Sequence, residues 1–249
     1  MNPQHYASNG YARLSSAIDA GAAHAAARWI VDNRTRVEVP HTLDALDRRN
    51  QLPIKLRRLW DCDPDFWSGF VMRSGVLEVA SRWLGEEFLL IRSAAFIKYP
   101  GSRATVGWHC DEHLWGYECE AGLTVWIPLT LVPPQSGCLQ FIPGSHLRPP
   151  GRLYWDIRHP YHKVMDVTGF EPPVSVPVEV GDCIVMDKRT VHASGPNQSG
   201  AERIGLVFAF ARCAPERLTE SAVGITRGGC FHAVPAGGSS ESEHGVERH

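Results

Sequence analysis

The stretch LTVWIPLTLV, residues 123–132, decides the fold class of this chain of 249 residues. Aliphatic side chains occupy its odd positions from 123 to 129, and Thr, Trp and Pro occupy the even positions from 124 to 130. An alternation with a period of two is typical of a β-strand whose two faces meet different surroundings. The stretch therefore predicts one strand of a β-rich domain.

Further short strands are predicted on both sides of this one, and turn residues punctuate them. They are FLLIRSAAFIKYPG (88–101), as a strand pair or one long bent strand, CLQFIPGSH (138–146), VSVPVEVGDCIVMD (174–187), as two strands around Gly181-Asp182, and RIGLVFAFA (203–211). Short antiparallel strands with such punctuation favour a barrel or a two-sheet jelly roll.

The first 85 residues are predicted to be mainly helical. Ser15-Ser16 is a candidate cap for an Ala-rich helix that ends near Asn33, and Asp63-Pro64 is a good start for another, with Asp as cap and Pro as first residue. We expect a single domain over residues 1–233, with the helical part at 1–85, the jelly-roll core at 86–213 and a disordered polar tail at 234–249.

Composition excludes several classes of partner. The net charge is -2 and no basic stripe stands out, so nucleic acid is not expected as a partner. No apolar run approaches the ~20 residues that cross a bilayer, and no signal peptide is evident. The seven cysteines are odd in number and form no C-x-x-C, so free thiols in a reducing cytoplasm are expected. The oligomeric state is not readable from the sequence.

His109-Cys110-Asp111, together with the distant His192, is the candidate metal site. On a strand, positions i and i+2 point to one face, so His109 and Asp111 can reach one ion. Two imidazoles and one carboxylate suit non-heme Fe(II), because they leave other metal positions open. An H-x-D pair alone is weak, since a chain with 12 His and 27 acidic residues is expected to hold about one by chance.

Arg203 opens the strand RIGLVFAFA, and the residues on its own face are mostly small. Small neighbours leave room for a molecule to lie beside the arginine. An arginine inside a barrel requires an anion, because an unpaired buried charge is very costly. A carboxylate that pairs with both arms of the guanidinium is the best solution. The alternative is an arginine at the strand edge, exposed or paired with Glu202.

The order of these motifs along the chain resembles the phytanoyl-CoA dioxygenase family of Fe(II)/2-oxoglutarate oxygenases, including the W-H-x-D-x-x-x-W pattern of its ectoine hydroxylases. The resemblance covers about residues 85–211. The matching pieces are WHCDEHLW (108–115), LTVWIPLT (123–130), SGCLQFIPGSH (136–146), VGDCIVMDKRTVHASGPN (180–197) and Arg203. The resemblance implies a mainly β fold with flanking N-terminal helices, a double-stranded β-helix of the jelly-roll or cupin-like type.

The resemblance also implies a cofactor set and the residues that hold it. Fe(II), 2-oxoglutarate as cosubstrate and O2 would be used. The metal ligands would be His109, Asp111 and His192.

Four further positions would contact the cosubstrate. Arg203 would bind the distal carboxylate of 2-oxoglutarate with help from Ser194, and Trp126 would line the cofactor site. One residue of the strand RSAAFIKYPG (92–101) would add a contact, and Ser93, Ala95 and Lys98 are the candidates. Halogenating relatives carry a small residue at the carboxylate position, so Asp111 argues for oxygen transfer.

Substrate contacts are expected near the metal pair and in a long aperiodic loop at residues 148–173, which would act as a lid. The candidates are His113, Trp115, Tyr154, Trp155 and Arg158. The expected reaction is hydroxylation of a small-molecule metabolite, such as a natural-product or antibiotic intermediate, with release of succinate and CO2. Desaturation, epimerisation and ring closure on the same cofactors remain open, as do a cupin-like metalloprotein that uses no 2-oxoglutarate and a non-catalytic binding module.

Overall fold

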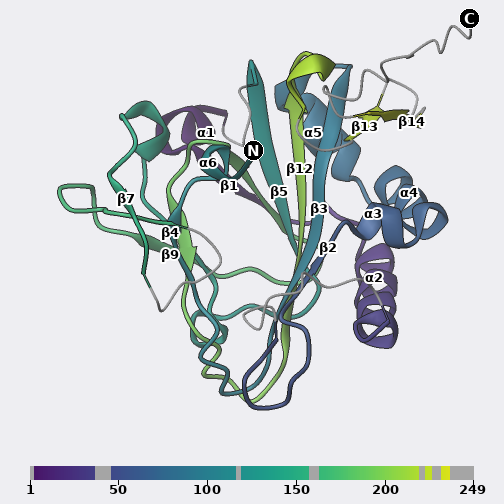
Figure 1. Cartoon of the computed structure of the whole chain (residues 1–249), viewed down its shortest axis with the longest axis horizontal. Coiled ribbons are helices and arrows are strands. Elements are labelled where there is room, and N and C mark those ends of the chain that lie inside the picture. The colour runs from purple at the N-terminus through teal and green to yellow at the C-terminus, as the bar shows by residue number, and fades with distance from the viewer. Residues whose placement is uncertain are drawn as a thin grey trace, which may run out of the picture.

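A computed structural model describes residues 3–36, 46–115, 119–156, 163–218, 222–225 and 231–235 of the chain. Its centre is two β-sheets packed as a double-stranded β-helix (Figure 1). The larger sheet contains, in spatial order, β1 (Tyr11–Leu14), β10 (Cys183–Asp187), β5 (Ala121–Pro128), β12 (Arg203–Arg212), β3 (Phe88–Lys98), β13 (Ala222–Ile225) and β14 (Phe231–Val234). β2 (Lys55–Arg57) also pairs with β3, next to β13.

The smaller sheet faces the larger one and carries both histidines of the candidate metal site. Its order is β4 (Val106–His109), β11 (His192–Ser194), β6 (Leu139–Phe141) and β9 (Val174–Val176). A separate pair, β7 (Leu153–Tyr154) and β8 (Val164–Met165), lies in the predicted lid, so this segment has secondary structure of its own. The short 3-10 helices are Pro134–Ser136, Ser145–Leu147 and Pro215–Arg217.

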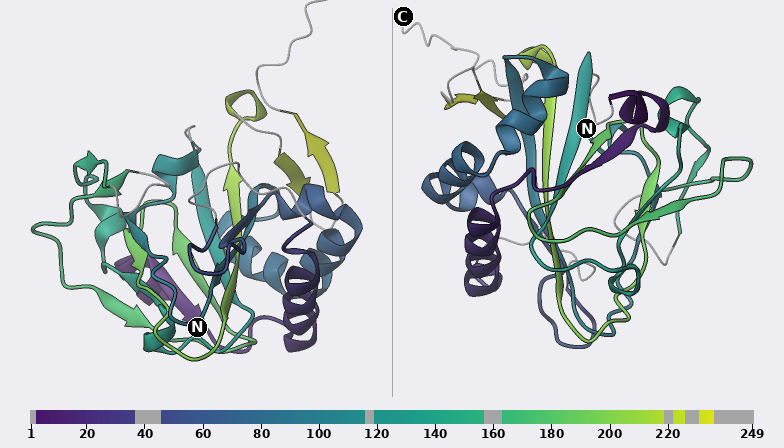
Figure 2. Two further views of the ribbon diagram at one scale, coloured as in Figure 1. Left: turned by 60° about the horizontal axis from the view of Figure 1, so that its bottom comes forward. Right: turned by 180° about the vertical axis from the view of Figure 1, so that it is seen from behind.

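The helices α2 (Ala20–Asn33), α3 (Leu59–Cys62), α4 (Pro64–Arg73) and α5 (Val76–Leu84) lie on the outer side of the larger sheet (Figures 1 and 2). Two short helices, α1 (Pro3–Asn9) and α6 (Glu112–Trp115), lie on the other side, toward the smaller sheet. Among the described residues, no helix is long and apolar enough to span a membrane.

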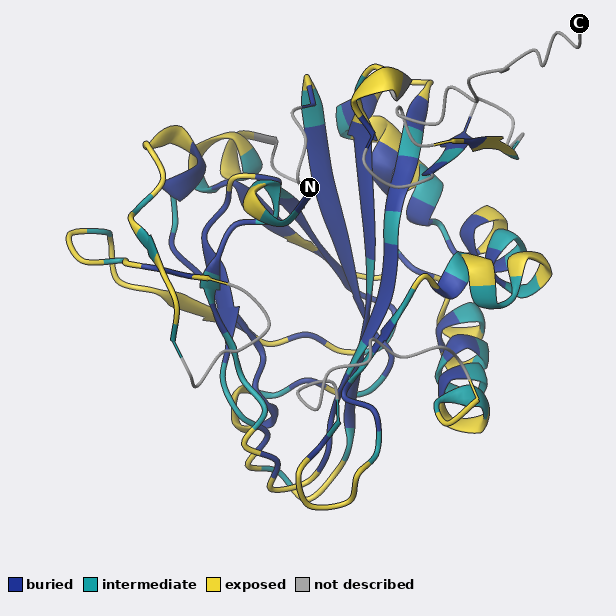
Figure 3. Cartoon of the chain, in the orientation of Figure 1, coloured by how far each residue is buried: buried dark blue, intermediate teal, exposed yellow. Residues whose placement is uncertain are grey.

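The alternation in LTVWIPLTLV is confirmed, because the two faces of β5 enter different cores. Leu123, Val125 and Ile127 pack in the core beneath the helices, together with Phe208 of β12. Trp126 points the other way, into a second core between the two sheets. The dark strands of Figure 3 show how completely the centre of the larger sheet is buried. One face of the strand thus stabilises the fold, and the other is available for a site.

The chain ends differ from the expectations in detail. The N-terminal part is mainly helical, as expected, and also contributes two strands, β1 and β2, to the larger sheet. The first long helix begins at Ala20, and Asp19, rather than Ser15-Ser16, caps it by accepting a hydrogen bond from the Ala22 N–H at 2.7 Å. The sheet also continues past residue 213, because the β13–β14 hairpin adds to the edge of β3. Most of the predicted tail lies outside the described residues.

Candidate active site

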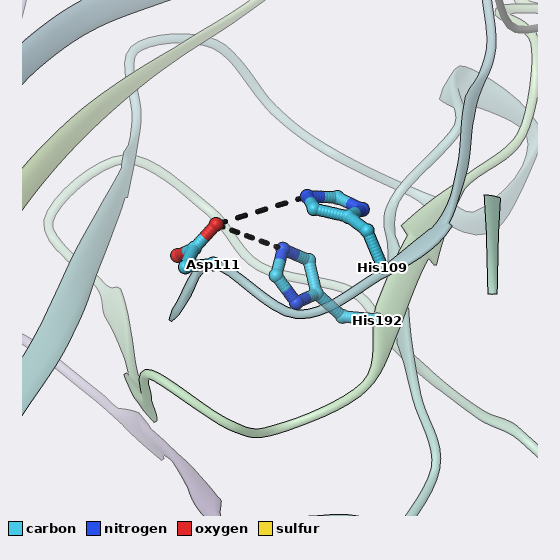
Figure 4. Close-up of side chains that lie close together, drawn as sticks. All are labelled: His109, Asp111 and His192. Atoms are coloured by element: carbon cyan, nitrogen blue, oxygen red, sulfur yellow. Dashed lines mark ion pairs between the residues drawn. The ribbon is translucent and has the colours of Figure 1, made fainter. Parts of the chain in front are cut away.

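The three predicted metal ligands converge between the sheets (Figure 4). His192 of β11 lies directly opposite His109 of β4 in the strand register. Asp111 follows two residues later, in the turn after β4 rather than on the strand itself. Its Oδ1 lies 3.7 Å from Nε2 of His109 and 3.9 Å from Nε2 of His192. The ligand atoms all fall within 4.8 Å of one another, which is close enough for one ion.

The backbone determines which nitrogen of each ring faces Asp111. Nδ1 of His109 lies 2.8 Å from the Gly107 carbonyl, and Nδ1 of His192 lies 3.0 Å from the Thr190 carbonyl. A carbonyl only accepts hydrogen bonds, so each Nδ1 carries the proton and donates it. In the neutral ring each Nε2 then presents a lone pair toward the carboxylate. Such a convergence of lone pairs and negative charge is what a metal cation stabilises.

Thr124 holds the carboxylate in place. Its hydroxyl, which is almost fully buried, donates a 2.5 Å hydrogen bond to Oδ2 of Asp111. Oδ1 is left to face the two imidazoles. Three ligands from one side satisfy the donor set that non-heme Fe(II) prefers. The residues present therefore fit the iron that the sequence motif implies.

Arg203 supplies a buried positive charge in the same cavity. Its guanidinium lies over the Trp126 ring at 4.6 Å, and one arm donates to the Gly137 carbonyl at 3.3 Å. Its Nε is buried without a partner, and no ion pair joins it to a carboxylate among the described residues. Burial lowers its pKa to about 10, so it stays protonated at neutral pH. A buried cation with an unused donor indicates a site for an anion.

Gly205, one of the small residues on the face of Arg203, makes room for the Trp126 side chain. A Cβ at Gly205 would meet Cζ2 of Trp126 at 2.2 Å. The absence of a side chain there allows the indole to pack closely against β12 and to contact the guanidinium.

Lys98 is the register partner of Arg203 on β3 and is also buried. Its ammonium donates to the Ser194 hydroxyl at 2.7 Å, to the Ser194 carbonyl at 3.1 Å and to the Gly195 carbonyl. Burial and then the charge of Arg203 hold the pKa of Lys98 well below its usual value. Lys98 thus fixes Ser194 next to Arg203.

Of the other two candidates on this strand, Ser93 lines the same cavity and Ala95 does not. The Ser93 hydroxyl accepts from the Trp60 N–H at 3.1 Å, and Ala95 packs in the core beneath the helices.

The site lies in one cavity of about 1370 Å³. Its wall contains the three metal ligands, Arg203, Ser194 and Trp126. Strand β3 contributes a further stretch of the wall. Other parts come from elements that the sequence did not point to as cavity wall, namely α2, β2, α3 and the β13–β14 hairpin.

Only some of the predicted substrate residues line the cavity. Trp115 lines the cavity. His113 is exposed, with its Nδ1 3.5 Å from the Cys110 sulfur. Tyr154 and Trp155 are exposed at 41% and 69% and are not among the lining residues. Arg158 lies outside the described residues.

Sequence reasoning missed several lining residues, notably Lys55, Arg57, Trp60, Arg92 and Phe231. A weak signal was present for the first two, because IKLRR (54–58) alternates apolar and basic residues. Such a stretch is too short to stand out against ordinary loop composition.

The fold recurs in solved structures of other proteins. The non-heme α-ketoglutarate-dependent carbocyclase SnoK from nogalamycin biosynthesis is 24% identical, with a TM-score of 0.66 over 90% of this chain and 84% of that one. EvdO2 from Micromonospora carbonacea var. aurantiaca, complexed with 2-oxoglutarate, is 25% identical, with a TM-score of 0.66 over 84% of this chain and 89% of that one.

Curated relatives match over a central segment. "Dioxygenase af480" of Aspergillus fumigatus is 27% identical over 152 residues, which are 58% of this chain and 44% of the relative. "Methylphosphonate hydroxylase" of Gimesia maris is 28% identical over 148 residues, 57% of this chain and 53% of the relative. The matched segments thus span about half the length of these relatives.

The family-level match is broader than either pairwise match. The sequence profile of the phytanoyl-CoA dioxygenases matches residues 6–205, which include the three candidate metal ligands, Trp126, Ser194 and Arg203. With its double-stranded β-helix and its His-Asp-His site, the chain belongs to the phytanoyl-CoA dioxygenase family.

Proposed function

We propose that this protein is an Fe(II)- and 2-oxoglutarate-dependent dioxygenase that hydroxylates a small-molecule metabolite. The observation that carries the proposal is the pairing of two sites in one cavity. One is a three-ligand metal site with an open face, and the other is the buried, unpaired Arg203. A metalloprotein that uses no 2-oxoglutarate has no need of the second site.

Iron bound at His109, Asp111 and His192 would use O2 and 2-oxoglutarate to oxidise a substrate C–H bond, with release of succinate and CO2. The protein's own residues supply position and charge. Arg203 would pair with the distal carboxylate of 2-oxoglutarate, which gives its unused Nε–H an acceptor. The Ser194 hydroxyl already accepts from Lys98, so its own proton is available to the same carboxylate. Trp126 shields this pair from water.

Hydroxylation is the proposed outcome because Asp111 occupies the carboxylate position and because one relative is named a hydroxylase. Two neighbours in fold, a carbocyclase and an epimerase from nogalamycin biosynthesis, favour rearrangement on the same cofactors as the second candidate. Product mass separates them, since hydroxylation adds one oxygen and epimerisation adds none. The same neighbours support a natural-product intermediate as substrate.

We also propose that the described sheets and helices form one domain and that the protein works in the cytoplasm. Among the described residues the cysteines are free thiols, and Cys110, Cys119, Cys138 and Cys183 are buried. Buried reduced thiols suit a reducing compartment.

The test is a pair of anaerobic titrations by calorimetry, with Fe(II) first and 2-oxoglutarate second. We expect Arg203→Met to bind iron as the wild type does and to bind 2-oxoglutarate about 100-fold more weakly, because a carboxylate bound in the cavity loses its cation. Arg82→Met, which removes an exposed arginine of α5, is the matched control and leaves both affinities unchanged. Iron-loaded wild-type protein that neither binds 2-oxoglutarate nor forms succinate from it would overturn the proposal.

A further inference from the structure

A second group of cations lines the cavity along the β2–β3 edge, apart from Arg203. Lys55 and Arg57 alternate on β2, and Arg92 lies on β3. Arg57 pairs with Ala94, which is two residues from Arg92, so the arginines share one face of the sheet. Burial, then the charges of Arg57 and Arg92, lower the pKa of Lys55 to about 8. This wall of the cavity is therefore strongly positive.

The carboxylates nearby are committed to other tasks. Asp61 pairs with Arg58 at 2.6 Å. Asp63 caps α4 through the Phe66 N–H and accepts from the indole N–H of Trp29 at 2.8 Å. Asp111 is the metal ligand.

Arg92 has unused hydrogen-bonding capacity. One arm of its guanidinium donates to the Leu114 carbonyl at 2.7 Å. Its Nε is buried with no partner, and no carboxylate pairs with it among the described residues. A buried charged donor without an acceptor is costly, and an oxyanion is the acceptor that suits a guanidinium best.

One molecule of 2-oxoglutarate cannot pair with both Arg92 and Arg203. On the shared register of β3 and β12, Lys98 pairs with Arg203 and Arg92 pairs with Ala209, six residues further along. At about 3.3 Å per residue the two arginine positions are about 20 Å apart along the sheet, which is beyond the reach of a five-carbon diacid.

Along the strand direction, the backbone of Arg92 is in register with Thr124, which contacts Asp111 of the candidate metal site. Ala209 pairs with Arg92 on one side and with Thr124, the partner of Asp111, on the other. Two strand spacings give about 10 Å between the backbones of Arg92 and Thr124. A small molecule can therefore touch Arg92 while one of its carbon atoms lies beside the metal site.

We propose that the primary substrate is a small organic acid whose oxyanion (a carboxylate, phosphate, phosphonate or sulfonate) binds Arg92, with Arg57 beside it. The inference rests on the proposed function, which supplies the reaction. Trp60, Trp115 and Phe231 line the same cavity, so the body of the substrate meets aromatic side chains. The substrate class is therefore an acid with an apolar or aromatic body.

The probes are a matched pair, 8-anilinonaphthalene-1-sulfonate and N-phenyl-1-naphthylamine, which share one ring system and differ in the sulfonate. Both fluoresce on entering an apolar pocket. The protein is first loaded anaerobically with Fe(II) and 2-oxoglutarate, so that the cosubstrate occupies Arg203. We expect the wild type to bind the sulfonate at least about 10-fold more tightly than the neutral probe. Arg92→Gln should lose this preference and bind the neutral probe normally, and Arg82→Met should keep it.

Arg92→Lys separates charge from structure. It retains a positive charge and so should keep a preference for the sulfonate that Arg92→Gln loses. Equal preference in wild type and Arg92→Gln, or equal loss in Arg92→Gln and Arg92→Lys, would overturn the proposal. Weaker 2-oxoglutarate binding by Arg92→Gln would also overturn the proposal, because it would show that Arg92 binds the cosubstrate. Failure of the wild type to load with iron and 2-oxoglutarate is a different result, and it contradicts the proposed function itself.

Discussion

Single residues determine how the metal ligands point. The carbonyl two positions before each histidine, at Gly107 and at Thr190, receives the Nδ1 proton. That His109, Asp111 and His192 lie together could be predicted from H-x-D, the distant His and the motif order. Thr124 could not, because its contact with Asp111 joins β5 to the turn after β4, and only the folded sheets bring these together.

Thr124→Val tests this contact at the scale of one hydroxyl. Valine has nearly the same shape, so packing is kept and Asp111 loses the hydrogen bond that orients it. We expect Fe(II) affinity to fall about 10-fold, in the range found when the outer partner of a ligand is removed. Competition with a chromophoric chelator measures this. Thr130→Val, which removes the hydroxyl that accepts the Ile204 N–H, is the control and should leave iron affinity unchanged. Equal iron affinity in all three proteins would contradict the assigned role of Thr124.

At the scale of elements, long alternating strands are predictable and short edge strands are not. β5 and β12 have clear apolar patterns, and residues 88–101 form one strand, β3, up to Lys98. β2 has three residues and β13 has four, too few to show a period. They exist because the edge of β3 supplies backbone partners. The positive wall of the cavity was missed for the same reason.

The start of α4 at Asp63-Pro64 is confirmed and gives a prediction for this element. Asp63 caps the helix and also binds the Trp29 indole of α2. Asp63→Ala should lower the free energy of unfolding by about 2 kcal/mol, because both hydrogen bonds are lost. Asp63→Asn keeps an acceptor for the cap and should lose less. Urea unfolding curves measure both values, and a loss as large in Asp63→Asn as in Asp63→Ala would show that the cap itself contributes nothing.

For the whole molecule, the buried thiols predict a loss of stability at alkaline pH. Burial, with a smaller effect of Asp182, raises the pKa of Cys183 from 9.0 to about 12. The unfolded chain therefore releases a proton above pH 9 that the native state keeps. Because the unfolded state then binds fewer protons, the free energy of unfolding falls as pH rises, by up to about 1.4 kcal/mol per pH unit from this group.

Cys183→Ala should lower stability at pH 8, because it leaves a small cavity, and should flatten the decline between pH 9 and 10.5. Tyr99, whose pKa burial raises to about 12, contributes its own decline above pH 10 equally in both proteins. Denaturant unfolding at a series of pH values gives the two curves. Parallel curves would show that Cys183 does not titrate as described.

Both flanks of the chain contribute to the cavity wall, whereas the candidate metal ligands come from its middle. β2 and α3 precede the ligands, and the β13–β14 hairpin follows them, beyond residue 205 where the family match ends. Selection acting on these flanks can change which molecule enters while the three ligands stay untouched. For directed evolution, libraries that randomise the cavity-lining residues of these flanks, such as Lys55, Arg57, Trp60, Val223 and Phe231, and hold 106–205 constant should therefore yield altered substrate scope at little cost in iron binding.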